Sequence, residues 1–315
     1  MLLLKSLTRG LALLVATCVG THSAVAQAST TPLELVVLGS GGPGAVGRAA
    51  SCYLVLIDDN ARILVDAGPG AFARLGEARL SLTGTDIVLL THLHIDHAGE
   101  LPGLFKARAV SGGDSIVFKV WGPAGTGNRH QGAHFPSTSR FLDLLFGTEG
   151  AFAYLRDFAA PITLRAHDIP AKVQLNPVPQ IIFNEDGLVI KAIAGHHGDA
   201  PAVIYRIDYA GKSITFSGDI DAKGLPGLRT IAKGSDLLVF NSVVLDPPGS
   251  RAILYTLHTP PRAIGELARD AGVHSVLLSH ISPSVEENQD AVLDSIKRSY
   301  QGPVSLAADG TRVRP

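Results

Sequence analysis

Cysteine is scarce in this 315-residue chain, which contains two. Cys18 lies in an N-terminal stretch with the pattern of a signal peptide, so the mature chain would keep Cys52 alone. A single cysteine excludes an intramolecular disulfide. Because the run 51–57 is apolar and strand-like, we expect Cys52 to be buried as a small hydrophobic residue and not to act as a nucleophile.

The N-terminal stretch combines a charged start, an apolar run and small residues. Lys5 and Arg9 precede the apolar run 10–20, and cleavage after Ala26 or Ala28 fits the small residues there. The run is too short to span a bilayer comfortably. We therefore predict that residues 1–26 are a cleaved signal peptide. Residues 27–315 would then be a periplasmic or secreted domain without stable membrane association.

The chain also has no excess of basic residues. The chain has 27 basic and 28 acidic residues, and loss of Lys5 and Arg9 leaves 25 against 28, a net charge near −3. Such a surface offers no broad cationic field for a polyanion. We therefore expect a small-molecule substrate and no nucleic-acid partner. The sequence leaves the oligomeric state open, a homodimer included.

Histidine, in contrast, is concentrated in one short run, Thr91–His97, which follows an apolar strand-like stretch. In an extended chain His92 and His94 point the same way, because side chains alternate with period two. Asp96 and His97 lie just beyond and can reach a second ion. Imidazole nitrogen and carboxylate oxygen are ligands of catalytic zinc. The alternative is a polar turn with surface histidines, but such a turn needs no such density of them.

The H-x-H-x-D-H spacing resembles the metal-binding signature of the metallo-β-lactamase-fold hydrolases. Upstream, 63–68 is similar to the strand ending in Asp-x-Gly that precedes the signature in this family. The resemblance implies that the Asp66 carboxylate supports and orients the metal-binding loop. On local grounds alone, Asp66 could equally be a turn-capping residue.

A distant segment, 195–206, resembles the "His, short gap, Pro-Ala-x-x-Tyr-Arg" segment of the ribonuclease-Z-like and arylsulfatase-like branches. Adjacent residues of an extended chain point opposite ways, so only one of His196 and His197 can face the metal. His197, four residues before Pro201, fits the family spacing better. His196 would then line the wall of the site.

Two further strand ends match the family's remaining ligands. Asp219 follows Gly218 after an apolar strand and resembles the aspartate that bridges two metals. His280 ends the apolar run 275–279 and matches the last ligand. Either feature alone is ordinary, but four strand ends in the expected order, each with the expected ligand type, are not.

His258 resembles the histidine of the "His-Ser/Thr" segment in the ribonuclease-Z-like branch. The resemblance implies that it faces the scissile group and stabilises charge there or protonates the leaving oxygen. In the alternative, Thr259 caps a helix that begins with Pro260, and His258 is merely exposed. The companion glutamate of that branch's His-Glu-Ala-Thr box is missing from 240–244, which argues against tRNA 3′-processing.

One glycine motif must be set aside. Residues 39–44 satisfy G-x-G-x-x-G after a strand, but a dinucleotide-binding turn must open a helix. Pro43 and Gly44 lead instead into another strand-like run, so we predict a β-hairpin.

Short β-rich runs alternate with helical patterns in two similar halves, which predicts an α/β fold, the four-layer αββα sandwich of the metallo-β-lactamase family. A lid-like insertion is expected at about 122–166, where His130 and His134 would be lid or surface residues. The expected strands are 33–39, 52–57, 62–66, 86–91, 188–194, 202–209, 212–217, 237–240 and 276–279, and the expected helices are 71–77, 100–108, 262–271 and 286–300.

The sequence thus predicts a hydrolase with two zinc ions per chain, with Mn²⁺ or Fe²⁺ as alternatives. The predicted metal ligands are His92, His94 and His197 for the first ion, Asp96, His97 and His280 for the second, and Asp219 as the bridge; Asp96 and His258 are the candidate catalytic residues. A water held between the ions would lose its proton near neutral pH and attack an ester. The expected substrate is a sulfate, phosphate or carboxylic ester, as in the arylsulfatase-like branch. The alternatives are a ribonuclease-Z-like phosphodiesterase acting on nucleotides and a non-catalytic metal-binding module.

Overall fold

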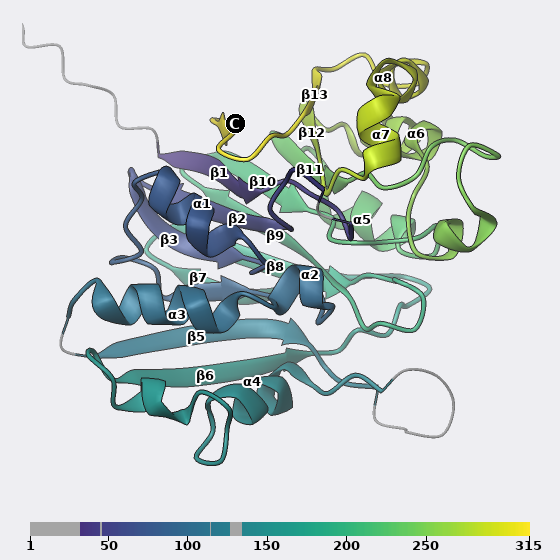
Figure 1. Ribbon diagram of the computed structural model, residues 1–315. Helices are drawn as coiled ribbons and strands as arrows, with labels where there is room; N and C mark the ends of the chain where they lie inside the picture. Colours follow the sequence, from purple (N-terminus) through teal and green to yellow (C-terminus); the bar gives the residue numbers. More distant parts are fainter. Residues whose placement is uncertain (1–31, 45, 114, 127–133) are drawn as a thin grey trace, which may run out of the picture. The chain divides into compact units, whose positions relative to one another are not determined.

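Two mixed β-sheets form the framework of the computed structural model, which describes residues 32–44, 46–113, 115–126 and 134–315 (Figure 1). The predicted signal peptide and His130 lie outside the described residues. Among the helices of the described residues, none is both long and apolar enough to cross a membrane.

The first sheet has the strand order β14-β1-β2-β3-β4-β5-β6. Its strands are β1 (Leu33–Gly39), β2 (Cys52–Ile57), β3 (Asn60–Val65), β4 (Ile87–Leu89), β5 (Ile116–Pro123), β6 (Ile162–Ile169) and β14 (Arg312–Val313). Pairing is antiparallel from β14 to β3 and parallel from β3 to β6. The β1–β2 pair is the predicted hairpin, and Cys52 is buried in it, as expected.

The second sheet repeats this plan with the order β13-β12-β11-β10-β9-β8-β7. Its strands are β7 (Gln180–Glu185), β8 (Leu188–Ala194), β9 (Val203–Tyr209), β10 (Lys212–Phe216), β11 (Leu237–Asn241), β12 (Ser275–Ser279) and β13 (Val304–Leu306). An antiparallel meander from β7 to β10 leads into parallel pairing from β10 to β13. The two halves of the domain are therefore similar in topology, as the sequence predicts.

The period-two pattern of the strands divides the core into layers. In β1, Leu35 and Val37 enter a core shared with Ile190 and Ile207 of the second sheet, so this core lies between the sheets. The intervening Val36 instead faces the helices on the outer side of the first sheet. The result is the predicted αββα sandwich.

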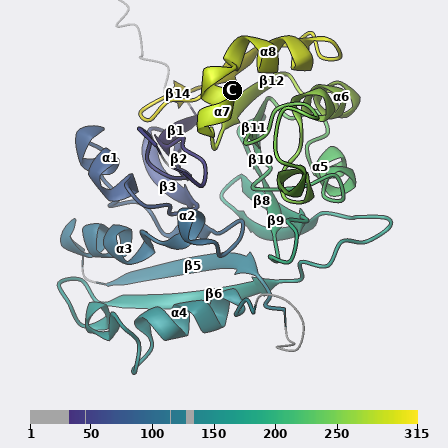
Figure 2. The same ribbon diagram turned by 45° about the vertical axis from the view of Figure 1, so that its right-hand side comes forward.

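Helices cover both outer faces (Figure 2). The first sheet carries α1 (Ala71–Glu77), α3 (Leu101–Val110) and α4 (Thr138–Phe146), and the second carries α5 (Leu225–Ile231), α6 (Pro261–Ala271) and α8 (Gln289–Lys297). Shorter elements are α2 (Ile95–Ala98), η1 (Ala153–Arg156), η2 (Ala252–Thr256) and α7 (Pro283–Glu287).

The structure differs from the sequence prediction in several places, and strands β5, β6, β7, β13 and β14 are additions to the expected set. The helix expected at 286–300 is two helices, α7 and α8, because Asn288 between them has non-helical backbone angles (φ −123°, ψ 33°). The expected insertion contains the end of β5 and most of β6. Its helix α4 buries Leu142 and Phe146 against the first sheet, whereas Phe135 lies with its ring 5.5 Å from that of His94. His134 is exposed, as predicted.

The fold brings the polar strand ends to one edge. Strands β10, β11 and β12 are parallel, so Asp219, Asn241 and His280 all lie at or beyond their C-terminal ends. In the first sheet, β3 and β4 are also parallel, and Asp66 and the histidine run follow them. Loops at the C-terminal ends of parallel strands are where such folds carry function.

Candidate metal centre

The histidine run leaves β4 extended and then turns into a short helix. His94 is the last extended residue (φ −66°, ψ 152°) before α2 begins at Ile95. His92 and His94 therefore project to the same side, with His92 Nε2 3.1 Å from His94 Nδ1. The first turn of α2 then places Asp96 and His97 beside them.

Asp66 holds this run from behind. Its Oδ1 accepts the backbone N–H of Thr91 (2.7 Å), and its Oδ2 accepts the Thr91 hydroxyl (2.9 Å) and Nδ1 of His97 (2.8 Å). Because the Thr91 hydroxyl proton goes to Asp66, its oxygen is left to accept Nδ1–H of His92 (3.1 Å). Nδ1 of both His92 and His97 thus carries a proton, and Nε2 of each ring faces the cluster.

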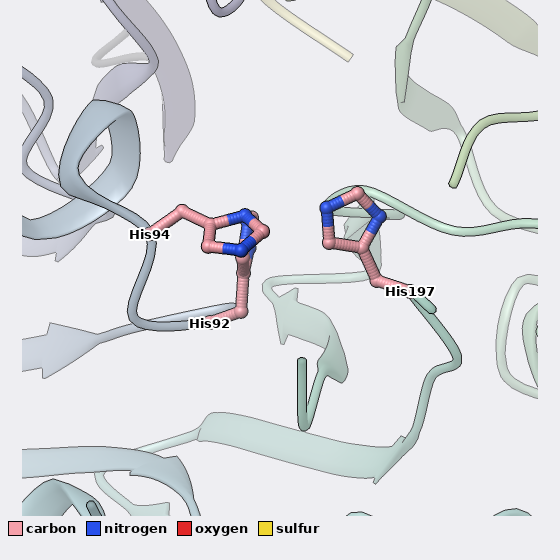
Figure 3. Close-up of side chains that lie close together, drawn as sticks. All are labelled: His92, His94 and His197. Atoms are coloured by element: carbon pink, nitrogen blue, oxygen red, sulfur yellow. The ribbon is translucent and has the colours of Figure 1, made fainter. Parts of the chain in front are cut away.

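The segment after β8 separates its two histidines. His197 is buried, and its Nδ1 donates to the Leu257 carbonyl at 2.8 Å, so its Nε2 lone pair also points inward, 3.6 Å from Asp219 Oδ2. His196 turns away and pairs with Asp221 through Nδ1 (2.8 Å). Figure 3 shows the ring of His197 facing those of His92 and His94 across the site.

Asp219 lies at the centre of the cluster. Gly218 before it has φ 56° and so little room that a Cβ there would lie 2.8 Å from Cβ of Thr91, which explains the need for glycine. Oδ1 of Asp219 accepts the side-chain amide of Asn241 (2.8 Å). Its Oδ2 lies near five imidazoles, those of His280 (3.5 Å), His97 (3.6 Å), His197 (3.6 Å), His92 (3.9 Å) and His258 (3.9 Å).

His280 closes the second half of the site. The residue follows β12 with an uncommon positive φ of 54°, and its Nε2 lies 3.3 Å from Asp96 Oδ2. Burial raises the pKa of Asp96, but the hydrogen bond with His280 and the nearby His97 outweigh it and bring that pKa to about 2. Asp96 is therefore an anion at neutral pH.

His258 lies inside the site, not on the surface. It is buried, its Nδ1 has no hydrogen-bond partner among the described residues, and burial lowers its pKa to about 4 against the attraction of Asp219. The helix-cap alternative does not hold, because the Thr259 hydroxyl donates to the carbonyl of Ile220 and α6 has no side-chain cap.

The residues fit a divalent cation. Ligand atoms lie within 4.8 Å of one another in four groups: His92, His94 and His197; Asp96, His97 and His280; His92, His97 and Asp219; His197, Asp219 and His258. Nε2 of His97, His197 and His92 lies 3.6, 3.6 and 3.9 Å from Oδ2 of Asp219, and a cation held there would bind these nitrogens and the carboxylate together. Burial lowers the pKa of His97, but Asp66 and Asp219 outweigh it and raise that pKa well above its ordinary value, so the local field favours positive charge.

A known domain family matches the greater part of the chain. The family described as "Beta-lactamase superfamily domain" matches residues 61–281, a segment that contains every residue of these four groups. The chain belongs to the beta-lactamase superfamily. The family, the fold and the His/Asp groups together identify a metal-dependent hydrolase.

Relatives of this superfamily member include two mycobacterial proteins named ribonuclease Z. The protein of Mycobacterium sp. (strain KMS) is 26% identical over 268 residues, covering 82% of this chain and 87% of the relative. That of Mycobacterium avium (strain 104) is 27% identical over 295 residues, covering 90% and 98%.

Solved structures share the superfamily fold. Human tRNase Z, short form, gives a TM-score of 0.68 at 19% identity, covering 90% of this chain and 99% of that one. Zn²⁺-bound PqqB from Methylobacterium extorquens gives 0.60 at 16% identity, covering 89% and 99%. At these identities the likeness concerns the fold alone.

The relatives correct the expected partner. A small-molecule ester substrate with no nucleic acid is wrong, because these relatives are ribonucleases, and their name also favours the ribonuclease-Z-like branch over the arylsulfatase-like one. The prediction of no nucleic-acid partner was wrong because it rested on the net charge of the whole chain. A charge summed over the whole surface does not describe the field at one site, where bound cations are the largest local charges.

Sequence reasoning also missed partners of the superfamily site. The Asn241 amide, the Leu257 carbonyl and the Asp221 carboxylate each hold a site residue or its neighbour. The sequence did contain an indication for Asn241. This residue follows an apolar run predicted as a strand, just as Asp219 and His280 do. The other two contacts depend on how distant loops pack.

Proposed function

We propose that this chain is a zinc-dependent phosphodiesterase that hydrolyses RNA. The observation that carries the proposal is the convergence of two sets of ligand atoms on Asp219. His92, His94 and His197 would hold one zinc ion, Asp96, His97 and His280 a second, and Asp219 would serve both. Ribonuclease Z relatives that align over 87% and 98% of their own length support RNA as the substrate.

The chain's own groups prepare the site for the ions. Asp66, Thr91 and the Leu257 carbonyl hold Nδ1 of three ligand histidines and so fix the orientations of their rings, with Nε2 of each directed inward. Burial is the main cause that lowers the pKa of His92 well below its ordinary value, which keeps this ligand neutral. When bound, divalent cations make water a nucleophile near neutral pH and polarise a phosphoryl oxygen.

His258 would act on the leaving oxygen. With a pKa lowered to about 4, the imidazole is neutral at pH 7, and it can donate a hydrogen bond to negative charge that develops there. Its Nδ1 has no partner among the described residues and lies 3.9 Å from Asp219 Oδ2, so it borders the reacting centre.

The test is cleavage of RNA by the purified zinc-loaded protein. End-labelled unstructured RNA and a tRNA precursor with a 3′ extension are incubated with wild type and with Asp219→Ala. We expect metal-dependent cleavage of RNA by wild type, and loss of both bound metal and cleavage in the variant. Comparison of the two RNAs also tests whether a chain that lacks the glutamate of the His-Glu-Ala-Thr box removes the 3′ extension of a tRNA precursor.

Aryl sulfate and aryl phosphodiester substrates measured beside the RNAs separate the remaining outcomes. Turnover of the sulfate ester without RNA cleavage would overturn the proposal. Full RNA cleavage by metal-free protein would do the same.

A further inference from the structure

A cleft of about 570 Å³ opens beside the metal centre. Three segments line it: 124–126 after β5, 170–173 after β6, and 195–201 between β8 and β9. His197, whose Nε2 lies 3.6 Å from Oδ2 of Asp219, is one of the lining residues. The cleft therefore borders the reacting centre, and its size lies within the roughly 300–1,000 Å³ of small-ligand sites.

His196 lines the same cleft and is held firmly from behind. Its Nδ1 lies 2.8 Å from Oδ2 of Asp221, and the backbone N–H of Asp221 donates to the His196 carbonyl, also at 2.8 Å. Oδ1 of Asp221 accepts the backbone N–H of Lys223 at 2.8 Å. The His196 side chain is 25% exposed and that of Asp221 only 7%. A buried carboxylate thus orients a histidine whose opposite edge remains available to a ligand.

The pairing determines what that edge can recognise. A carboxylate only accepts hydrogen bonds, so the proton of the neutral imidazole lies on Nδ1 and Nε2 is an acceptor. A fixed acceptor in the cleft suits a group that donates, such as a hydroxyl. In RNA every nucleotide carries a 2′-hydroxyl, and this group is how proteins distinguish RNA from DNA.

We propose that this cleft is a nucleoside subsite, in which Nε2 of His196 accepts a hydrogen bond from a ribose 2′-hydroxyl of the substrate. Asp221 is the positioning residue that keeps this nitrogen an acceptor. The inference rests on the RNA phosphodiesterase activity proposed above and identifies the ribose 2′-hydroxyl as the part of the substrate that the cleft recognises.

Asp221→Asn provides a sharp test of the hydrogen-bond direction. The Lys223 N–H requires an acceptor, so the amide oxygen of the variant would stay opposite it. The NH₂ group would then face Nδ1 of His196, which must accept, and the imidazole proton would move to Nε2. The subsite acceptor becomes a donor without any change in the shape of the histidine.

The experiment measures kcat/KM on RNA oligonucleotides in which one nucleotide at a time near the cleaved bond carries 2′-fluorine, which cannot donate. The proteins are zinc-loaded wild type, His196→Ala, Asp221→Asn and a matched control, His274→Ala. His274 is exposed and precedes β12, at the opposite end of that strand from His280.

For wild type and His274→Ala, we expect 2′-fluorine at one nucleotide position to lower kcat/KM by about 5- to 10-fold, which is the effect of one hydrogen bond. His196→Ala should be lower by a similar factor on all-ribose RNA and lose nothing further with fluorine. Asp221→Asn should also lose nothing further with fluorine, because its Nε2–H donates and no longer needs a proton from the 2′-position. Their zinc content should equal that of wild type.

The alternative outcomes are distinct. Equal discrimination by wild type and His196→Ala would overturn the subsite while RNA cleavage stands. The binding of the same oligonucleotides is measured in parallel by fluorescence anisotropy. A protein that hydrolyses an aryl phosphodiester but neither binds nor cleaves RNA would overturn the RNA part of the proposed function, and the subsite with it.

Discussion

The side-chain amide of Asn241 donates a 2.8 Å hydrogen bond to Oδ1 of Asp219 and so turns Oδ2 toward the histidines. Asn241 ends β11, which runs parallel to β10 and therefore delivers the amide beside the loop that carries Asp219. The backbone N–H of Asn241 in turn donates to the hydroxyl of Ser217. The stretch 240–244 thus supplies a support for the Asp219 carboxylate.

Asn241→Ala should weaken metal binding, because Asp219 would lose the bond that selects its orientation. Loss of such an outer support typically costs 10- to 100-fold in metal affinity or activity, and we expect a decrease of about that size. Zinc affinity is measured by competition with a chromophoric chelator, and turnover beside it. Ser242→Ala is the matched control, since its buried hydroxyl has no partner among the described residues. Equal affinities in both variants would remove Asn241 from this role.

The two neighbouring histidines should behave differently when replaced. His197→Ala should abolish binding of the ion that it shares with His92 and His94, because an inward Nε2 is lost. His196→Ala should keep that ion, because its ring is turned to Asp221. Zinc content after dialysis distinguishes the two variants. The opposite order would show that His196 is the ligand.

Much of this arrangement follows from local sequence. Histidines at strand ends can be predicted because strand periodicity is local and parallel strands end at one edge. The edge strand β6 was missed because its side chains alternate between exposed and half-buried over most of its length, which hides the apolar signal. The contact of Asn241 with Asp219 could not be predicted either, because it depends on the pairing of β11 with β10.

His258→Ala should lower turnover without releasing metal. A positioned acid–base or hydrogen-bonding group contributes about 10²- to 10⁴-fold, and the seven proposed ligands all remain in the variant. The loss should shrink for aryl phosphodiesters, whose leaving groups need no proton. Turnover of RNA and of a series of aryl esters is compared, with His274→Ala as control. An equal loss across leaving groups would show that His258 does not act on the leaving oxygen.

A pH-dependent contribution to stability should come from Glu34, far from the metal centre in sequence and contacts. This buried carboxylate in β1 accepts Nε of Arg312 in β14 at 2.7 Å and lies 3.7 Å from Arg314. The Arg312 hydrogen bond lowers the pKa of Glu34 below its ordinary value of 4.5, against the opposing effect of burial. The pair therefore stabilises the fold above pH 4.5, and this contribution is lost as the pH falls through the lowered pKa.

Arg312→Ala should accordingly lower the free energy of unfolding by about 1–3 kcal/mol at pH 7, because it removes the main partner of a buried carboxylate. The difference from wild type should shrink steadily below pH 4.5 as Glu34 takes up a proton. Urea unfolding of both proteins between pH 3 and 7 measures this difference, in which the titration of the histidine cluster cancels. In the Glu34→Gln background the arginine substitution should cost less and show little pH dependence. A pH-independent loss in both backgrounds would instead indicate that Arg312 acts through packing on β1.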